Sequence, residues 1–228
     1  ESSKSIGGIT NLLKKFSHFN CSKDDIIIVV GGGIILDLVA FFASIYKRGV
    51  NLFMIPTTLI GMTDASTGGK TCLNTDTGRN ELGTLYFPRY VYNNINFLTT
   101  NSDLHLRQGF SEMFKYSLLD SKDLLYELLE YNKNNDLKLL LKLIYDTAGI
   151  RLKIRKKNQF YSNLGHTFGQ ALEKISKHTI LHGDAISIGI VLALLSSVEK
   201  KIIKEEVKNT ILKYMVDLKL YTKIRYKI

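Results

Sequence analysis

The feature that most constrains this chain is a run of five β-branched residues, Ile26 to Val30, that ends in three glycines, Gly31 to Gly33. A short apolar run bounded by glycine predicts a strand and a tight loop, and the pattern of Ile34 to Tyr46 directly after it predicts a buried helix. Glycines between a strand and a helix N-terminus let the backbone approach a phosphate closely, which is typical of dinucleotide binding. The spacing is not GxGxxG, however, so a tight structural turn explains the glycines about equally well.

Two further strands are predicted in the first hundred residues. The apolar run Asn51 to Ile55 ends at Pro56 and opens into a polar segment, residues 57–80, that is rich in Thr, Gly, Asp and Asn. A third candidate strand covers Arg89 to Asn93. Because loops at strand ends carry chemistry on α/β scaffolds, we interpret residues 57–80 as a functional loop.

From about residue 103 the pattern becomes helical almost throughout. The predicted helices cover Asp103 to Leu119, Lys122 to Tyr131, Asp136 to Arg155, Leu164 to Ser176, Gly183 to Lys200 and Lys204 to Leu218. The sequence therefore predicts an α/β plus all-α fold, with a Rossmann-like domain at residues 1–100 and a helical domain at residues 101–228. A cleft between two such domains is the default location of an active site.

Composition narrows the possible partners. The 228 residues include 31 basic and 21 acidic ones, and the net charge of +10 attracts anions in general. The basic residues lack aromatic interleaving, so we expect a solvated surface and no nucleic acid. Cys21 and Cys72 form no CxxC pair, which favours a reducing compartment and a cytoplasmic location. The longest apolar stretch, Ala185 to Leu195, is shorter than the roughly 20 residues of a membrane span, so we expect no membrane partner.

The loop PTTLIGMTDASTGGK, Pro56 to Lys70, is too polar to be core. Lys70 follows two glycines and is suited to contact an anionic substrate group, and Asp64 is suited to hold a hydroxyl or an ammonium. A surface Ω-loop explains the same composition.

Three residues of the helical half suit a metal ion. Glu112 and Lys115 share one helix face, and spacing alone favours an exposed ion pair there. His166 and His182 each lie beside a glycine at the start of a largely apolar helix. One Glu and two His suit a catalytic zinc site with open coordination positions, although the spacing is unlike HExxH and buried structural histidines fit the pattern as well.

Seven motifs occur in order along the chain: 31–37 (GGGIILD), 46–49 (YKRG), 56–74 (PTTLIGMTDASTGGKTCLN), 78–80 (GRN), 111–116 (SEMFKY), 163–173 (NLGHTFGQALE) and 182–189 (HGDAISIG). They resemble the 3-dehydroquinate synthase family, whose motifs are GGGxxGD, YxRG, PTTLLAxxDSSxGGKTxxN, GKN, AExxKY, NxGHTFGHAxE and HGEAxxIG. The resemblance runs from Glu1 to the last helices. It implies a dehydroquinate-synthase-like fold in which a Rossmann-like domain, here partial, binds NAD and a helical domain binds zinc or cobalt.

The resemblance also implies roles for individual residues. The metal ligands would be Glu112, His166 and His182. The NAD contacts would be Gly32, Gly33, Asp37, Thr57, Thr58, Arg79 and Thr100. The catalytic and substrate-binding residues would be Asp64, Lys70, Asn80, Lys115, Asn163 and Arg48, the last reaching into the partner subunit of a homodimer.

The implied reaction belongs to the shikimate pathway of aromatic amino acid biosynthesis. NAD oxidises a secondary alcohol of 3-deoxy-arabino-heptulosonate 7-phosphate, phosphate is eliminated, the hydride returns, and the enol closes the ring of 3-dehydroquinate. NAD is therefore recycled in each turnover.

The chain departs from the family at several positions. Leu36 replaces a glycine of the glycine motif and is expected to crowd the dinucleotide, Gln170 replaces a histidine, and Gln159 replaces an arginine. We expect the first family strands to precede Glu1 and the last substrate lysine to follow Ile228. The alternatives are thus a related sugar-phosphate cyclase with another open-chain substrate and a truncated, inactive remnant.

Overall fold

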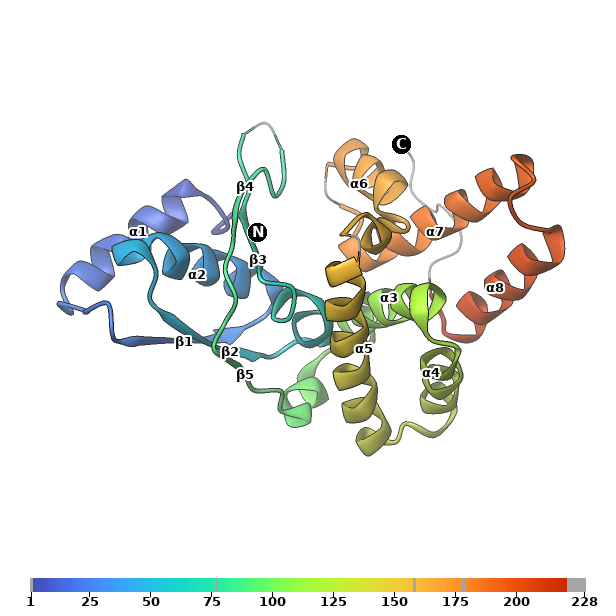
Figure 1. The fold of residues 1–228 in the computed structure, drawn as a ribbon, viewed down its shortest axis with the longest axis horizontal. Coiled ribbons are helices and arrows are strands. Elements are labelled where there is room, and N and C mark those ends of the chain that lie inside the picture. The colour runs from blue at the N-terminus through green and yellow to red at the C-terminus, as the bar shows by residue number, and fades with distance from the viewer. Residues whose placement is uncertain (1, 77, 158, 178, 221–228) are drawn as a thin grey trace. The chain divides into compact units, whose positions relative to one another are not determined.

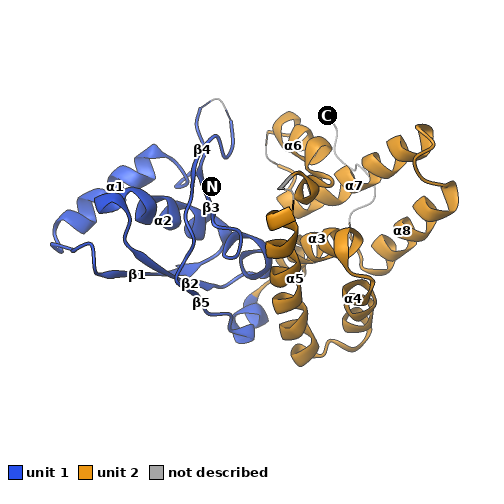
Figure 2. Cartoon of the chain, in the orientation of Figure 1, with its two compact units in different colours: residues 1–100 blue, residues 101–228 orange. Residues whose placement is uncertain are grey.

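The structure is a computed structural model that describes residues 2–76, 78–157, 159–177 and 179–220 (Figure 1). The chain divides into two compact units, Glu1–Thr100 and Asn101–Ile228 (Figure 2). Unit 1 is α/β and unit 2 is helical throughout its described part, as the sequence predicts.

Unit 1 is built on a parallel sheet of order β1-β2-β5. β1 (Ile26–Gly31) pairs along its whole length with β2 (Asn51–Pro56), so that both strands end at the same edge. β5 (Tyr90–Val91) is shorter than predicted, because only its two residues pair with β2. The carboxyl edge of β1 and β2 thus carries both the glycine loop, Gly31 to Gly33, and the PTT segment, Pro56 to Thr58. Open α/β sheets bind ligands at this edge.

One face of this sheet is covered by α1 (Ile6–Ser17) and α2 (Gly33–Ile45) (Figure 1). Alternate residues of β1, Ile27 and Val29, are buried in this core, as the period of a strand requires. Phe42 of α2 stacks on Tyr46 with ring centroids 5.0 Å apart and contacts Phe16 of α1 at 4.8 Å. Each such aromatic contact adds about 0.5–1.5 kcal/mol beyond the burial of its area.

The polar segment 57–80 is not one loop, so this part of the prediction was wrong. It contains a π-helical turn, η2 (Gly61–Ala65), and a strand, β3 (Lys70–Leu73). β3 pairs in an antiparallel hairpin with β4 (Leu82–Leu85), and a hydrogen bond of 2.7 Å joins the hydroxyls of Thr71 and Thr84. Because β3 pairs with a segment outside residues 57–80, the local composition of the segment did not reveal the strand. α1 was also not predicted.

Unit 2 begins with three helices, α3 (Asp103–Asp120), α4 (Lys122–Asn134) and α5 (Leu137–Lys157), and continues with α6 (His166–Ile175), α7 (His182–Glu199) and α8 (Glu205–Asp217). All six agree with the predicted helices to within about three residues. Further short helical turns in the described part of the chain are η1 (Tyr46–Arg48), η3 (Ile95–Thr100) and η4 (Gln159–Asn163).

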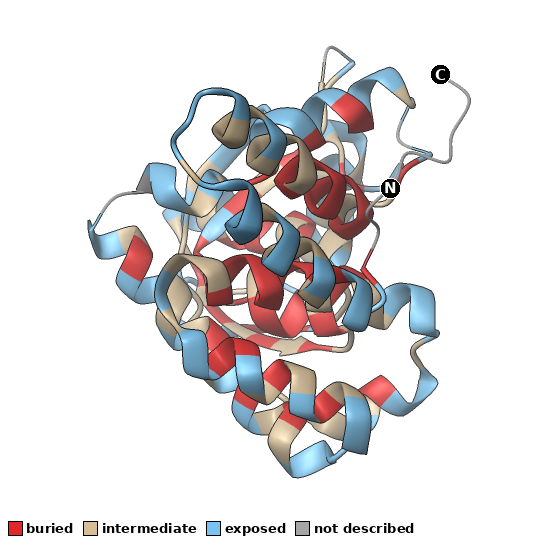
Figure 3. Cartoon of the chain, turned by 90° about the vertical axis from the view of Figure 1, so that its right-hand side faces the viewer, coloured by how far each residue is buried: buried red, intermediate tan, exposed pale blue. Residues whose placement is uncertain are grey.

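α7 is the central helix of unit 2. Its residues Gly183 to Ile190 are all buried, where α7 packs against α3 and α6 (Figure 3). By length and composition alone, α7 is also apolar enough to cross a membrane. Packing inside unit 2 accounts for that composition, because half of the helix is buried there.

Two glycines allow α6 and α7 to approach each other. Gly165 adopts a left-handed conformation with φ of +78° directly before α6, a region that favours glycine. A Cβ added at Gly189 of α7 would lie 2.0 Å from the carbonyl oxygen of Gly165. The glycines of the two histidine motifs therefore have a packing role, since they set the spacing of the helices that begin with His166 and His182.

Replacing Gly189 by alanine tests this spacing. Because the obstructing atoms are backbone atoms of Gly165 and Gly169, we expect G189A to lower the free energy of unfolding by about 1–3 kcal/mol, as overpacking typically does. The matched control is G149A on α5, where an added Cβ meets nothing within 4 Å. The control should be neutral or stabilising by about 0.5–1 kcal/mol. Equal effects of the two variants in urea unfolding would contradict this role of Gly189.

Candidate functional site

Glu112 is a carboxylate in the fully buried middle of α3. Neither of its oxygens accepts a hydrogen bond of normal geometry from a described residue. Lys115 lies one turn further along, and its Nζ is 2.5 Å from Oε2 of Glu112 and 4.3 Å from the centroid of the Tyr116 ring. The shared face was predicted correctly, but the expectation of an exposed pair was wrong, because both side chains are buried. A buried carboxylate needs positive charge nearby. Lys115 pairs with Oε2, whereas Oε1 points away from this lysine.

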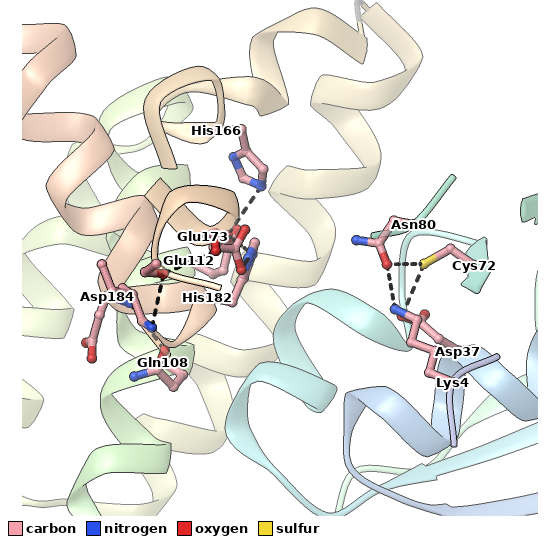
Figure 4. Close-up of polar contacts among 12 residues, drawn as sticks. Lys4, Asp37, Cys72, Asn80, Gln108, Glu112, His166, Glu173, His182 and Asp184 are labelled. Atoms are coloured by element: carbon pink, nitrogen blue, oxygen red, sulfur yellow. Dashed lines mark hydrogen bonds and ion pairs between the residues drawn. The ribbon is translucent and has the colours of Figure 1, made fainter. Parts of the chain in front are cut away.

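Two histidines face that oxygen. His166 is the first residue of α6 and His182 the first residue of α7. Their Nε2 atoms lie 3.8 Å and 3.5 Å from Oε1 of Glu112, and Figure 4 shows the three side chains converging. One ligand atom of each residue lies within 4.8 Å of the other two. The structure thus brings together the three residues that the sequence suggested as metal ligands.

The other nitrogen of each ring faces an acceptor. Nδ1 of His166 is 3.3 Å from the carbonyl oxygen of Leu164, and Nδ1 of His182 is 3.4 Å from Oε1 of Glu173. A proton on Nδ1 leaves Nε2 with a free lone pair, which is the arrangement found at metal-ligating histidines. In this arrangement both rings direct the lone pair of Nε2 toward Glu112, where it could bind a metal ion.

The electrostatics of the cluster favour a charged carboxylate. Burial by itself would raise the pKa of Glu112, but the ammonium of Lys115 and the two histidines outweigh it and hold this pKa well below its usual range. Burial by itself would lower the pKa of His182, yet Glu112 and Glu173 outweigh it and raise this pKa to about 10. The cluster therefore binds positive charge strongly, as a proton or as a cation.

A second ion pair fixes α3 against α7. Nε of Arg107 donates to Asp184 at 2.9 Å, and a second guanidinium nitrogen donates to the same carboxylate at 3.2 Å. Oε1 of Gln108 accepts a hydrogen bond from the backbone N–H of Asp184. One turn further along, the hydroxyls of Ser111 and Ser187 are 2.9 Å apart. Since Ser111 adjoins Glu112, these bonds set the distance between the carboxylate and His182.

Two other positions of unit 2 singled out in the sequence lie near the surface. Asn163, the last residue of η4, is exposed, and so is Gln170 on α6, at the position where the family has a histidine. The predicted contact of Asn163 with a substrate stays a prediction.

In unit 1 the glycine loop lies at the end of β1 and the start of α2. The backbone N–H of Thr57 donates to the carbonyl of Gly31 at 2.9 Å, which joins the loop to the PTT segment. A Cβ added at Gly32 would lie 3.2 Å from Cγ2 of Thr58. The loop thus presents glycine backbone without side chains at a helix N-terminus, which is the arrangement that a diphosphate requires.

A polar cluster joins Asp37 of α2 to the β3–β4 hairpin. Nζ of Lys4 lies 2.6 Å from Oδ2 of Asp37 and 2.7 Å from Oδ1 of Asn80, and the thiol of Cys72 approaches the same two oxygens (Figure 4). Burial raises the pKa of the Asp37 carboxyl, and Lys4 only partly offsets this effect. Two residues predicted to bind different ligands, Asp37 and Asn80, are therefore adjacent.

The remaining predicted residues of unit 1 lie in three places. Asp64 is half-buried in η2 and its charge acts on Asp37, while Arg79 is half-buried beside Asn80 in the chain. Lys70, Arg48 and Thr100 are exposed. Leu36 is fully buried in the core of unit 1, and its Cδ1 would lie 3.4 Å from a Cβ added at Gly61. The expected crowding of the dinucleotide by Leu36 stays a prediction.

Sequence reasoning missed three sets of residues in these clusters. Glu173 lies two helical turns after His166 and ends the same motif, and this spacing was the available indication of a shared face. Lys4 gave no local indication, because its partners are 33 and 76 residues away. Arg107 and Asp184 are 77 residues apart, and only the packing of α3 on α7 joins them.

A parallel α/β unit with a glycine loop, followed by a helical unit with a buried Glu–His–His cluster, defines a dehydroquinate-synthase-like fold. The model of 3-dehydroquinate synthase N-terminal domains matches residues 1–108, and that of the C-terminal domains matches residues 109–228. The chain therefore belongs to the 3-dehydroquinate synthase family.

Individual relatives agree with this assignment. The 3-dehydroquinate synthase of Sulfurisphaera tokodaii is 39% identical over 202 residues, which cover 84% of this chain and 57% of the relative. The 2-epi-5-epi-valiolone synthase of Streptomyces hygroscopicus subsp. jinggangensis, solved with NAD+ and Zn2+, is 26% identical with a TM-score of 0.90, over 99% of this chain and 66% of that one. A 2-deoxy-scyllo-inosose synthase solved with carbaglucose-6-phosphate, NAD+ and Co2+ shares the fold, with 23% identity and a TM-score of 0.88 over 100% of this chain and 65% of that one. The chain thus spans less than two thirds of the length of these relatives.

The Arg107–Asp184 pair yields a stability prediction. In D184N the guanidinium loses this charged partner inside unit 2, and we expect the free energy of unfolding to fall by roughly 3 kcal/mol, the lower end for breaking a buried pair. The control is K142M, which breaks the exposed pairs of this lysine with Glu127 and Asp146 and should cost less than about 1 kcal/mol. A cost for D184N no larger than that of the control, measured by urea unfolding, would show that the pair does not hold the two helices.

Proposed function

We propose that this chain provides the catalytic machinery of a 3-dehydroquinate synthase, a phosphate-eliminating lyase that converts 3-deoxy-arabino-heptulosonate 7-phosphate to 3-dehydroquinate. The observation that carries the proposal is the buried Glu112 carboxylate facing the Nε2 atoms of His166 and His182. Family membership and the identity to curated 3-dehydroquinate synthases support this substrate over that of another cyclase.

A divalent cation fits the Glu–His–His cluster. Tetrahedral ligands about 2 Å from a zinc ion lie roughly 3.3 Å from one another, and the two histidine-to-carboxylate distances of 3.5 Å and 3.8 Å are close to that value. Two histidines and one glutamate leave a coordination position open, as catalytic zinc sites do. Zn2+ or Co2+ is the proposed ion, since solved structures of the same fold hold one or the other.

NAD fits the carboxyl edge of the sheet in unit 1. We infer that Gly32 and Gly33 admit the diphosphate, and that Thr57 and Thr58 line the adjacent strand end. The other proposed contacts are Asp37, Arg79 and Thr100. When bound, NAD would supply reversible hydride transfer and the cation would supply Lewis acidity.

The chain's own residues would bind and orient a substrate with a carboxylate and a phosphate. Lysines suit such anions as point charges, and Lys70 and Lys115 are the candidates in the two units. Arg48, Asn80 and Asn163 are further proposed contacts. Asp64 is proposed to accept a hydrogen bond from a hydroxyl of the substrate. Lys115 pairs with Glu112, the same carboxylate that faces His166 and His182, which places its ammonium beside the Glu–His–His cluster.

The proposed partner is a second copy of the chain in a homodimer, with Arg48 contacting the site of the neighbouring copy. The proposed location is the cytoplasm, and neither nucleic acid nor a membrane is proposed as a partner. The family's metabolic role and the two free cysteines support this location.

Metal content tests the ligand assignment. In E112Q the charge that attracts a cation between His166 and His182 is lost, so we expect bound zinc, measured by mass spectrometry after dialysis, to fall at least tenfold. E130Q removes the same charge from the exposed face of α4 and should keep the zinc content of the parent. Circular dichroism verifies that both variants are folded. Unchanged zinc in a folded E112Q would refute the assignment.

Phosphate release tests the reaction. The purified chain with Zn2+, NAD+ and 3-deoxy-arabino-heptulosonate 7-phosphate should release phosphate, and omission of NAD+ or chelation of zinc should abolish the release. Other open-chain sugar phosphates serve as the comparison. A preference for one of these would indicate another cyclase. Protein that releases no phosphate and binds neither zinc nor NAD+ firmly would indicate an inactive remnant.

A further inference from the structure

Glu173 is a buried carboxylate on α6. It is 5% exposed and follows Leu172, which packs with Ile180 and Ala185 in the core between α6 and α7. Burying a charge costs free energy unless a partner compensates for it, so the presence of a carboxylate here points to a role beyond packing.

One partner of this carboxylate is the ring of His182. Oε1 of Glu173 lies 3.4 Å from Nδ1, while Nε2 of the same ring lies 3.5 Å from Oε1 of Glu112 (Figure 4). The two nitrogens point in different directions from the imidazole ring, so Glu173 contacts the side that faces away from the ligand cluster. This geometry excludes a simple role for Glu173 as one more member of that cluster.

We propose that Glu173 is the positioning residue that holds His182 with its proton on Nδ1 and its Nε2 lone pair toward the metal. A carboxylate that accepts the Nδ1–H fixes both the tautomer and the ring orientation, and it makes the opposite nitrogen a stronger donor. The corresponding nitrogen of His166 faces the neutral carbonyl of Leu164. The inference rests on the proposed metal centre and adds a residue to it.

Two variants separate positioning from folding. E173Q keeps the shape and an acceptor oxygen but removes the charge, and we expect the zinc affinity to fall about 10–100-fold, measured by competition with a chelator. E173L removes both the charge and the acceptor. It should lose at least as much zinc affinity, and circular dichroism verifies that the metal-free variant is folded, because removing one partner of a buried ionic contact also lowers stability. E130Q on the exposed face of α4 is the charge-matched control and should change neither quantity.

Spectroscopy gives a readout that a purely structural role would not change. In the zinc-bound parent protein, nitrogen-correlated NMR should show His182 with a slowly exchanging proton on Nδ1, and in E173L this proton should exchange faster or be lost. The Co2+-loaded variants should show shifted visible absorption bands, because a ligand has changed its orientation.

The outcomes distinguish this inference from the proposed function. If the parent binds zinc, and both E173Q and E173L keep its zinc affinity and its Nδ1 proton, the role of Glu173 is overturned. The proposed metal centre then still stands. If the parent itself binds no zinc, the proposed metal centre fails, and the inference fails with it. Loss of zinc affinity in both variants, each of them folded, would support the inference.

Discussion

The buried charge of Glu112 is the interaction on which the helical unit depends. A carboxylate without exposure is unstable unless positive groups surround it, and α3, α6 and α7 each contribute one: Lys115, His166 and His182. The interactions of these positive groups with the buried carboxylate thus hold the three helices in one arrangement. The same buried charge supports the proposal that the cluster binds a cation.

Close backbone packing brings those charges within reach of one another. Without side chains at Gly165 and Gly189, α6 and α7 approach until their first residues face the same oxygen of Glu112. The Arg107–Asp184 pair then fixes α3 on α7. The motifs that identify the family therefore mix two kinds of residue, those that carry chemistry and those that set the spacing of the helices. In a single sequence the two kinds look alike.

Departures from the family pattern differ in what they change. Leu36 lies in the core of unit 1, where its side chain takes part in packing. Gln170 is exposed on α6, and its amide, unlike the histidine of the family motif, does not titrate near neutral pH. Neither departure replaces Glu112, His166 or His182, so the set of three cluster residues is intact.

The sequence by itself determined the order of the main elements and the six helices of unit 2, because periodicity is a property of neighbouring residues. Its resemblance to the family indicated the three cluster residues. Tertiary structure decided the burial of Glu112 and Lys115, the pairing of β3 with β4, and the contacts of Lys4, Arg107 and Glu173. Each of these joins separate segments of the chain, or depends on which helix face is covered. Burial and long-range pairing are set by packing, and packing is not encoded in any one segment.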